Sequence, residues 1–121
     1  MRLESLKYLH DIEQAARLLS RFSLGKSLAE YQADPLLRSG IERQFIIIGE
    51  ALNRFSKLEP EVGLTITGHR QIIDFRNILV HGYDVVRDER VWDIVEHHLP
   101  VLIEEAADLK KKGDEENPPE L

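Results

Sequence analysis

Residues 34–58, DPLLRSGIERQFIIIGEALNRFSKL, form the stretch that decides the fold class. In Asp34-Pro35, the aspartate can accept hydrogen bonds from the free amides of a first helical turn, and a proline in that turn loses no bond. The main apolar residues then recur every three or four positions, within about 40° of one direction on an ideal helix. They are Leu37, Ile41, Phe45, Ile48, Leu52 and Phe55. The stretch therefore predicts one long amphipathic helix that runs to about Leu58.

The same helix carries a second apolar strip about a quarter-turn from the first. Its members are Leu36, Ile47, Ala51 and Leu58. One bundle core needs a single strip, so the second predicts that this helix is partly buried against another subunit. Opposite the main strip, Glu50 has Arg54 four residues on and Arg43 two turns back. Two interpretations stay open: an ordinary exposed pair of charges, or a surface that binds a second subunit or a substrate.

Two helical segments precede the long helix. From Leu3 to about Phe22 the apolar positions keep a helical spacing, and Gly25 ends the segment. Its buried stripe is predicted to be Leu9, Ile12, Ala16 and Leu19. Ser27-Leu28-Ala29-Glu30 has the form of a capping box, in which the serine and the glutamate bond to each other's backbone amides. This motif predicts a short helix.

Another helix follows the long one. Glu59-Pro60-Glu61-Val62-Gly63 breaks the helical pattern and predicts a connection. Thr65 or Thr67 can cap the next helix. That helix is expected to end near Gly82, where a glycine in the left-handed region closes the last turn without steric cost.

Asp88 is predicted to cap the last helix, and Lys110-Lys111-Lys112 with Gly113 to end it. Its apolar stripe is Val91, Trp92, Val95, Leu99, Leu102, Ala106 and Leu109. Pro100 lies inside this helix and predicts a kink one turn earlier, near Glu96, whose carbonyl loses its hydrogen-bond partner.

No alternating strand pattern is present, so the fold class is all-α: an antiparallel four-helix bundle with one extra short helix. At 121 residues the chain is large enough for one core only. Residues 1–112 are predicted to form the helical domain. Residues 113–121 are acidic and contain two prolines, so we expect a disordered tail.

Composition excludes several classes of function. The chain has no cysteine, which excludes disulfides, thiolate metal sites and cysteine nucleophiles. The net charge of −6 argues against a non-specific nucleic-acid coat, though not against a local positive groove. The adjacent His97 and His98 face different sides of a helix and have no clear third ligand, so no metal and no cofactor are expected. Without a membrane-spanning or signal-like apolar segment, we expect a cytoplasmic protein.

The chemically richest stretch is Arg76-Asn77-Ile78-Leu79-Val80-His81-Gly82-Tyr83. A histidine exchanges protons near neutral pH, an arginine holds a phosphate or a developing oxyanion, and a tyrosine offers a hydroxyl. These side chains can form a phosphodiester-cleaving site. On an ideal helix, however, Arg76 and His81 point about 140° apart. Either a local departure from the helix or a second copy across a dimer axis would bring them to one phosphate.

A purely structural interpretation of the same residues is also open. Arg76 can pair with Asp74, Asp84 or a carbonyl, and His81 can cap the end of its helix. Tyr83 can lie in the core with its hydroxyl hydrogen-bonded.

Motifs along nearly the whole chain bear a family resemblance. They are Ile48-Gly49-Glu50-Ala51, the stretch 76–83 with its Arg-x4-His-x-Tyr pattern, Val91-Trp92 and Leu99-Pro100. Together they resemble the HepT-like branch of the HEPN superfamily. The segment 63–70 lacks the proline and tryptophan that many relatives carry there, which bears on the substrate groove more than on the motif.

The resemblance implies an all-helical homodimer that acts as a toxin and cleaves RNA without a metal ion. It implies Arg76 and His81 as the cleavage pair, Asn77 as their polar neighbour, and Tyr83 as the residue to which an MntA-type nucleotidyltransferase antitoxin transfers AMP. The competing interpretation is a non-catalytic binding module that partners a minimal nucleotidyltransferase. A purely structural dimer is the third, and it would not require Arg76, His81 and Tyr83 together.

Overall fold

The computed structural model describes residues 1–117, apart from the side chain of Tyr83. This part of the chain is built from helices and contains no strand, so the all-α prediction is confirmed. The long helices are α1 (Leu3–Ser23), α3 (Pro35–Leu58), α5 (His69–His81) and α7 (Leu99–Glu116). The short elements are α2 (Leu28–Ala33), α4 (Pro60–Gly63), η1 (Tyr83–Val85), α6 (Asp88–Asp93) and η2 (Ile94–His98). Within residues 1–117, no helix is both long and apolar enough to cross a membrane.

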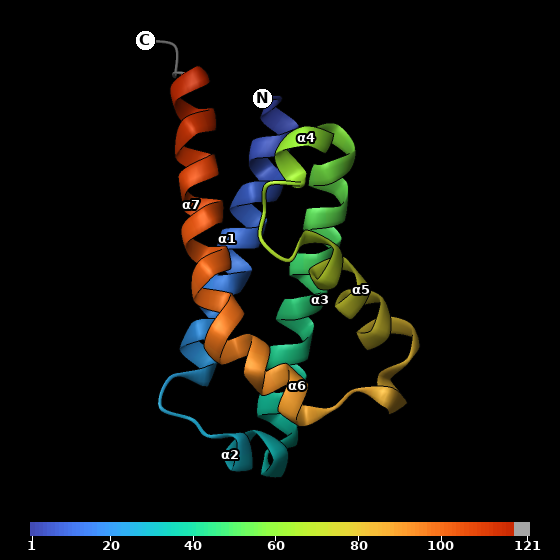
Figure 1. Cartoon of the computed structure of the whole chain (residues 1–121). Helices are drawn as coiled ribbons and strands as arrows, with labels where there is room; N and C mark the ends of the chain where they lie inside the picture. Colours follow the sequence, from blue (N-terminus) through green and yellow to red (C-terminus); the bar gives the residue numbers. More distant parts are fainter. Residues whose placement is uncertain (118–121) are drawn as a thin grey trace.

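The long helices run alternately up and down, as Figure 1 shows. α1 packs against both α3 and α7, whereas α5 packs mainly against α3. In Figure 1, α5 lies on the side of α3 away from α7. α5 is therefore an outer helix, attached to the layer that α1, α3 and α7 form.

The core is made by the apolar stripes expected from the sequence. Its fully buried members on the two central helices are Leu9, Ile12, Ala16 and Leu19 of α1 and Ile41, Ile48, Leu52 and Phe55 of α3. Trp92 of α6 is also buried, with its ring centroid 5.5 Å from that of Tyr31. The second strip of α3 is uneven, because Ala51 is buried and Leu36 is 83% exposed. Its burial by a second subunit stays a prediction.

Two helix starts are confirmed. The Ser27 hydroxyl accepts a hydrogen bond from the Glu30 amide at 3.2 Å and begins α2. One carboxylate oxygen of Asp34 accepts from the amides of Leu36 and Leu37 at 3.0 and 3.2 Å, and Pro35 is the first residue of α3.

Two other predicted caps are wrong. The residue before α5 is Gly68, with φ 73°, rather than Thr65 or Thr67. The Thr67 hydroxyl instead donates to Glu105 of α7 at 2.8 Å, so it ties the α4–α5 connection to the last helix. Asp88 does not cap α6: it is the first helical residue.

Gly82 ends α5 as predicted, but not in the left-handed region, because its φ is −135°. Its amide donates to the Ile78 carbonyl at 2.7 Å, which closes the last turn. Where a kink was expected, near Glu96, the last helix becomes π-helical over η2, just before Pro100. The predicted connection 59–63 contains the short helix α4.

The predicted end of the last helix is wrong. α7 continues through Gly113 to Glu116, so residues 113–116 are helical rather than disordered, and the predicted domain boundary at 112 lies inside α7. Gly113 is buried, and a Cβ there would lie 2.2 Å from Cδ2 of Leu6. The glycine therefore permits close packing of α7 on α1 and does not stop the helix. Asn117 follows as the residue after the helix, and residues 118–121 of the predicted tail lie outside the described residues.

Candidate active site

The stem of Arg76 lies directly against the backbone of α3. A Cβ at Gly49 would be 2.2 Å from Cβ and 2.7 Å from Cγ of Arg76, closer than real atoms approach. A glycine in a helix interior costs about 1 kcal/mol relative to alanine, so it needs such a reason. Gly49 therefore lets α5 approach α3 at the position of the arginine.

Two polar side chains hold the Arg76 guanidinium. One terminal nitrogen donates to Glu50 of α3 at 2.6 Å, and the other donates to the Asn77 side-chain oxygen at 2.8 Å. These partners differ from Asp74, Asp84 or a carbonyl, which the structural interpretation offered. The side chain is 25% exposed, and its Nε is buried without a hydrogen-bond partner among the described residues. An arginine has five N–H donors, so two bonds leave donors for an anion.

Glu50 joins two arginines. Besides Arg76, it accepts a hydrogen bond from Nε of Arg54 at 2.9 Å. The Arg54 hydrogen bond and the charge of Arg76 hold the pKa of Glu50 below its ordinary value of 4.5. Glu50 is therefore ionised at neutral pH and can fix the Arg76 guanidinium as a charged partner.

His81 is the last residue of α5 and is exposed. Its side chain makes no hydrogen bond or ion pair within the described part of the chain. α5 stays α-helical through His81, so a local departure from the helix does not bring it to Arg76, and the two side chains keep the separation of about 140° of an ideal helix. Asn77 precedes His81 by four residues and shares its face.

The remaining candidate residues lie on three elements, η1, α3 and η2. Tyr83 begins η1, directly after the end of α5, and its side chain lies outside the described residues. Arg43 and Glu50 of α3 line one cavity of about 290 Å³ between α1 and α3. His97 and His98 are exposed on η2. Among residues 1–117, no three histidine, aspartate or glutamate side chains gather as metal ligands would.

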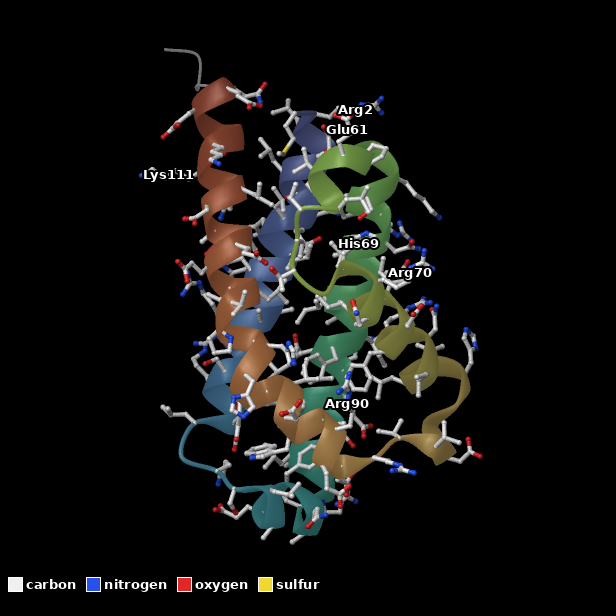
Figure 2. All side chains as sticks on the ribbon, in the orientation of Figure 1. Arg2, Glu61, His69, Arg70, Arg90 and Lys111 are labelled. Atoms are coloured by element: carbon white, nitrogen blue, oxygen red, sulfur yellow. The ribbon has the colours of Figure 1, made fainter. Side chains whose placement is uncertain are left out.

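A second polar contact between α3 and α5 was not expected from the sequence. The Ser56 hydroxyl lies 2.7 Å from Nε2 of His69, the first residue of α5. Figure 2 shows His69 where α5 begins beside α3. The sequence separation of Ser56 and His69 could not have indicated this contact, because the contact depends on how the connection between α3 and α5 folds. The role of Gly49 could have been predicted, because a glycine inside a long helix is less favourable than alanine and suggests that another backbone or side chain approaches closely.

Comparisons with known proteins show the family to which the chain belongs. The family model described as "Ribonuclease HepT-like" matches residues 12–109. A "Probable ribonuclease HepT" of Thermococcus cleftensis is 29% identical over 108 residues, which cover 86% of this chain and 94% of that protein. A protein of Caldanaerobacter subterraneus subsp. tengcongensis with the printed name "Putative RNase" is 27% identical over 105 residues, 87% of this chain and 93% of the relative. No solved structure matches. The chain belongs to the HepT-like ribonuclease family.

Proposed function

We propose that this chain is the toxin of a toxin–antitoxin pair and that it cleaves RNA without a metal ion, using Arg76 and His81. One observation carries the proposal. In a chain of a ribonuclease family, an arginine is fixed by Glu50 and Asn77 on a helix that ends in an exposed histidine. Such a pair supplies an anion-binding fork and a proton acceptor on one short element.

RNA carries its own nucleophile, the 2′-hydroxyl, so cleavage needs proton removal and charge stabilisation rather than a metal-bound water. The unprotonated His81 imidazole takes the 2′-hydroxyl proton while the 2′ oxygen attacks phosphorus. The 5′ oxygen leaves and takes up a proton, and a 2′,3′-cyclic phosphate remains. Arg76 stabilises the charge on the non-bridging oxygens, and Asn77 keeps the guanidinium in place.

The site is completed by a second copy of the chain. α5 buries only Leu79, while Ile78 and Val80 are 41% and 40% exposed. Ile78 and Val80 flank the exposed face of α5 that carries His81, so a two-fold dimer formed through α5 covers part of this apolar surface. In such a dimer the exposed His81 of one chain is the proton acceptor for the phosphate held by Arg76 of the other, since the regular helix keeps the two apart within one chain.

The antitoxin is an MntA-type nucleotidyltransferase that modifies Tyr83. The tyrosine oxygen attacks the α-phosphorus of ATP, pyrophosphate leaves, and AMP stays on the side chain. Tyr83 lies two residues after His81, so the added phosphate repels RNA and competes for Arg76.

The test is cleavage of total RNA in excess EDTA, by protein whose intact mass shows no AMP, beside the His81→Ala variant. Cleavage that survives the chelator and falls by about 10²–10⁴-fold in the variant supports the proposal, the range expected for removal of a general base. His81 is exposed, so thermal unfolding should not change. Absence of cleavage by both proteins would instead favour a binding module that partners a nucleotidyltransferase.

A further inference from the structure

A groove runs between α1 and α3, beside the Arg76 site but outside the catalytic pair. It has a volume of about 290 Å³. α3 lines it with residues spaced three or four apart, among them Arg43, Ile47, Glu50 and Arg54, so they form one stripe of the helix. α1 contributes Lys7 and Tyr8. The stripe contains Ile47 and Ala51 of the second apolar strip, so part of that strip forms the floor of this groove.

The side chains that line the groove carry an excess of one positive charge, although the chain as a whole carries −6. Lys7, Arg43 and Arg54 line it together with the carboxylates of Asp11 and Glu50. Glu50 is already paired with Arg54 and Arg76. Arg43 and Lys7 make no ion pair within the described residues. Their charges are therefore available to an anion.

The groove also offers an aromatic face. The Lys7 ammonium lies 5.6 Å from the centroid of the Tyr8 ring. A contact of this kind is weak at an exposed position, and a lysine side chain is flexible, so a flat aromatic ligand can replace it. Bases of single-stranded RNA stack on such rings regardless of their identity.

We propose that this groove binds one nucleotide of the RNA strand, next to the phosphodiester that is cleaved, with its phosphate at Arg43 and its base against Tyr8 and Ile47. The inference rests on the proposed ribonuclease function. The position of the groove supports it, because Glu50 lines the groove and also pairs with Arg76, so the groove adjoins the site of the cleaved phosphate. The charge of Glu50 is already balanced by Arg54 and Arg76. The volume lies at the small end for ligand pockets, which suits a single nucleotide.

The test uses a fluorescent 2′-O-methyl RNA oligonucleotide, which lacks the attacking hydroxyl and cannot be cleaved. Its affinity is measured by anisotropy at several salt concentrations for the wild type, Arg43→Glu and the matched charge reversal Lys111→Glu. Figure 2 shows Lys111 on the outer side of α7, away from α1 and α3. Arg43→Glu should weaken binding about tenfold and lower the salt slope by about 0.7, as loss of one phosphate contact to a single strand does. Lys111→Glu should weaken it by less than about twofold.

A second pair of variants tests the base contact. Tyr8→Ala should weaken binding at least about fivefold, and Tyr8→Phe should retain it, because stacking needs the ring and not the hydroxyl. In cleavage assays, Arg43→Glu should raise KM with little change in kcat.

The outcomes separate this inference from the proposed function. If the wild type neither binds nor cleaves RNA, the function and the groove assignment both fail. If it cleaves RNA and Arg43→Glu behaves like Lys111→Glu, only the groove assignment fails. It also fails if Arg43→Glu turns a dimer into monomers in sedimentation, because the groove is then a subunit interface.

Discussion

α1 and α5 are both amphipathic helices, yet they are packed very differently. α1 buries seven of its 21 residues between α3 and α7, whereas α5 buries one of 13, Leu79. Burial of apolar surface is the main source of folding stability. The layer of α1, α3 and α7 therefore holds the fold together, and α5 presents side chains on it. Separating the two tasks lets a chain expose Ile78 and Val80 without losing its core.

α5 is held mainly by α3, against which Phe75 packs its ring on Phe45. Other contacts fix the position of Arg76 and of the start of α5. They include the stem of Arg76 against Gly49, the Arg76–Glu50 ion pair and the Ser56–His69 contact. Because α5 packs mainly on one helix, a local change at the α3–α5 contact can shift the site and leave the layer of α1, α3 and α7 intact. Three changes test this difference between the core layer and α5, and a fourth tests a partly buried carboxylate within the core layer.

The largest effect on stability should come from the core layer. Leu52→Ala leaves a cavity at a fully buried position of α3 and should lower the free energy of unfolding by about 2–5 kcal/mol. Ile78→Ala on α5 should cost less than about 0.5 kcal/mol per chain and weaken self-association instead. Urea unfolding at several protein concentrations separates folding from association. Equal losses in both variants would show that α5 is part of the core.

Gly49→Ala should shift α5 without unfolding the protein. The added Cβ meets Cβ of Arg76, which should lower the free energy of unfolding by about 1–3 kcal/mol and RNA cleavage by about 10²-fold. Gly40→Ala on the same helix is the matched control. Its Cβ would lie 3.4 Å from the Phe22 ring, so the better helix propensity of alanine should stabilise by up to about 1 kcal/mol. Full activity of Gly49→Ala would argue against this placement of Arg76.

Glu50→Gln should lower kcat/KM for RNA about tenfold, because a neutral amide anchors the guanidinium less well than a carboxylate does. Thermal unfolding should change little, since Glu50 is 36% exposed. Glu30→Gln is the control: it makes the same chemical change in a surface pair with Lys26. Loss of activity in both variants would point to overall charge rather than to the Arg76 contact.

The smallest effect concerns Glu42, two turns before Glu50 on α3. Burial, and then the charge of Asp88, raise the pKa of Glu42 despite the nearby Arg38. A raised pKa in the folded state means that stability is full below the unfolded value of 4.5 and is lost as pH rises through the folded value. Glu42→Gln cannot ionise, so it should raise Tm by roughly 2–4 °C at pH 7 and by nothing near pH 4. A lower Tm at pH 7 would contradict the assigned direction.

The sequence predicted the core layer because its signals are local. Periodic apolar residues marked α1 and α3, and Ser27 and Asp34 marked helix starts, since the bonds they make lie within three residues. Gly113 was predicted to end the helix because, in the sequence alone, a glycine that ends a helix cannot be distinguished from one that permits close packing. The neighbouring α1 shows that Gly113 is of the second kind. Thr67 failed as a cap for a similar reason: its partner, Glu105, lies 38 residues away.

The site was only partly predictable. Arg76 and His81 stood out by residue type, and the family resemblance added the significance of their spacing and the choice of Asn77. The roles of all three are predictions still. The pairing of Arg76 with Glu50 joins residues 26 positions apart, so spacing could suggest only the Glu50–Arg54 half of that cluster. The exposed face of α5 depends on how α5 packs against α3. The apolar pattern of α5 alone does not contain this information.

The most direct measurement mixes two inactive variants, Arg76→Ala and His81→Ala, carrying different affinity tags. Mixed dimers are isolated through both tags and assayed for RNA cleavage in EDTA. If one chain's Arg76 works with the other chain's His81, each mixed dimer has one intact site, and cleavage should return to about half the wild-type rate. If folded mixed dimers stay as inactive as the separate variants, a site shared between two α5 helices is contradicted.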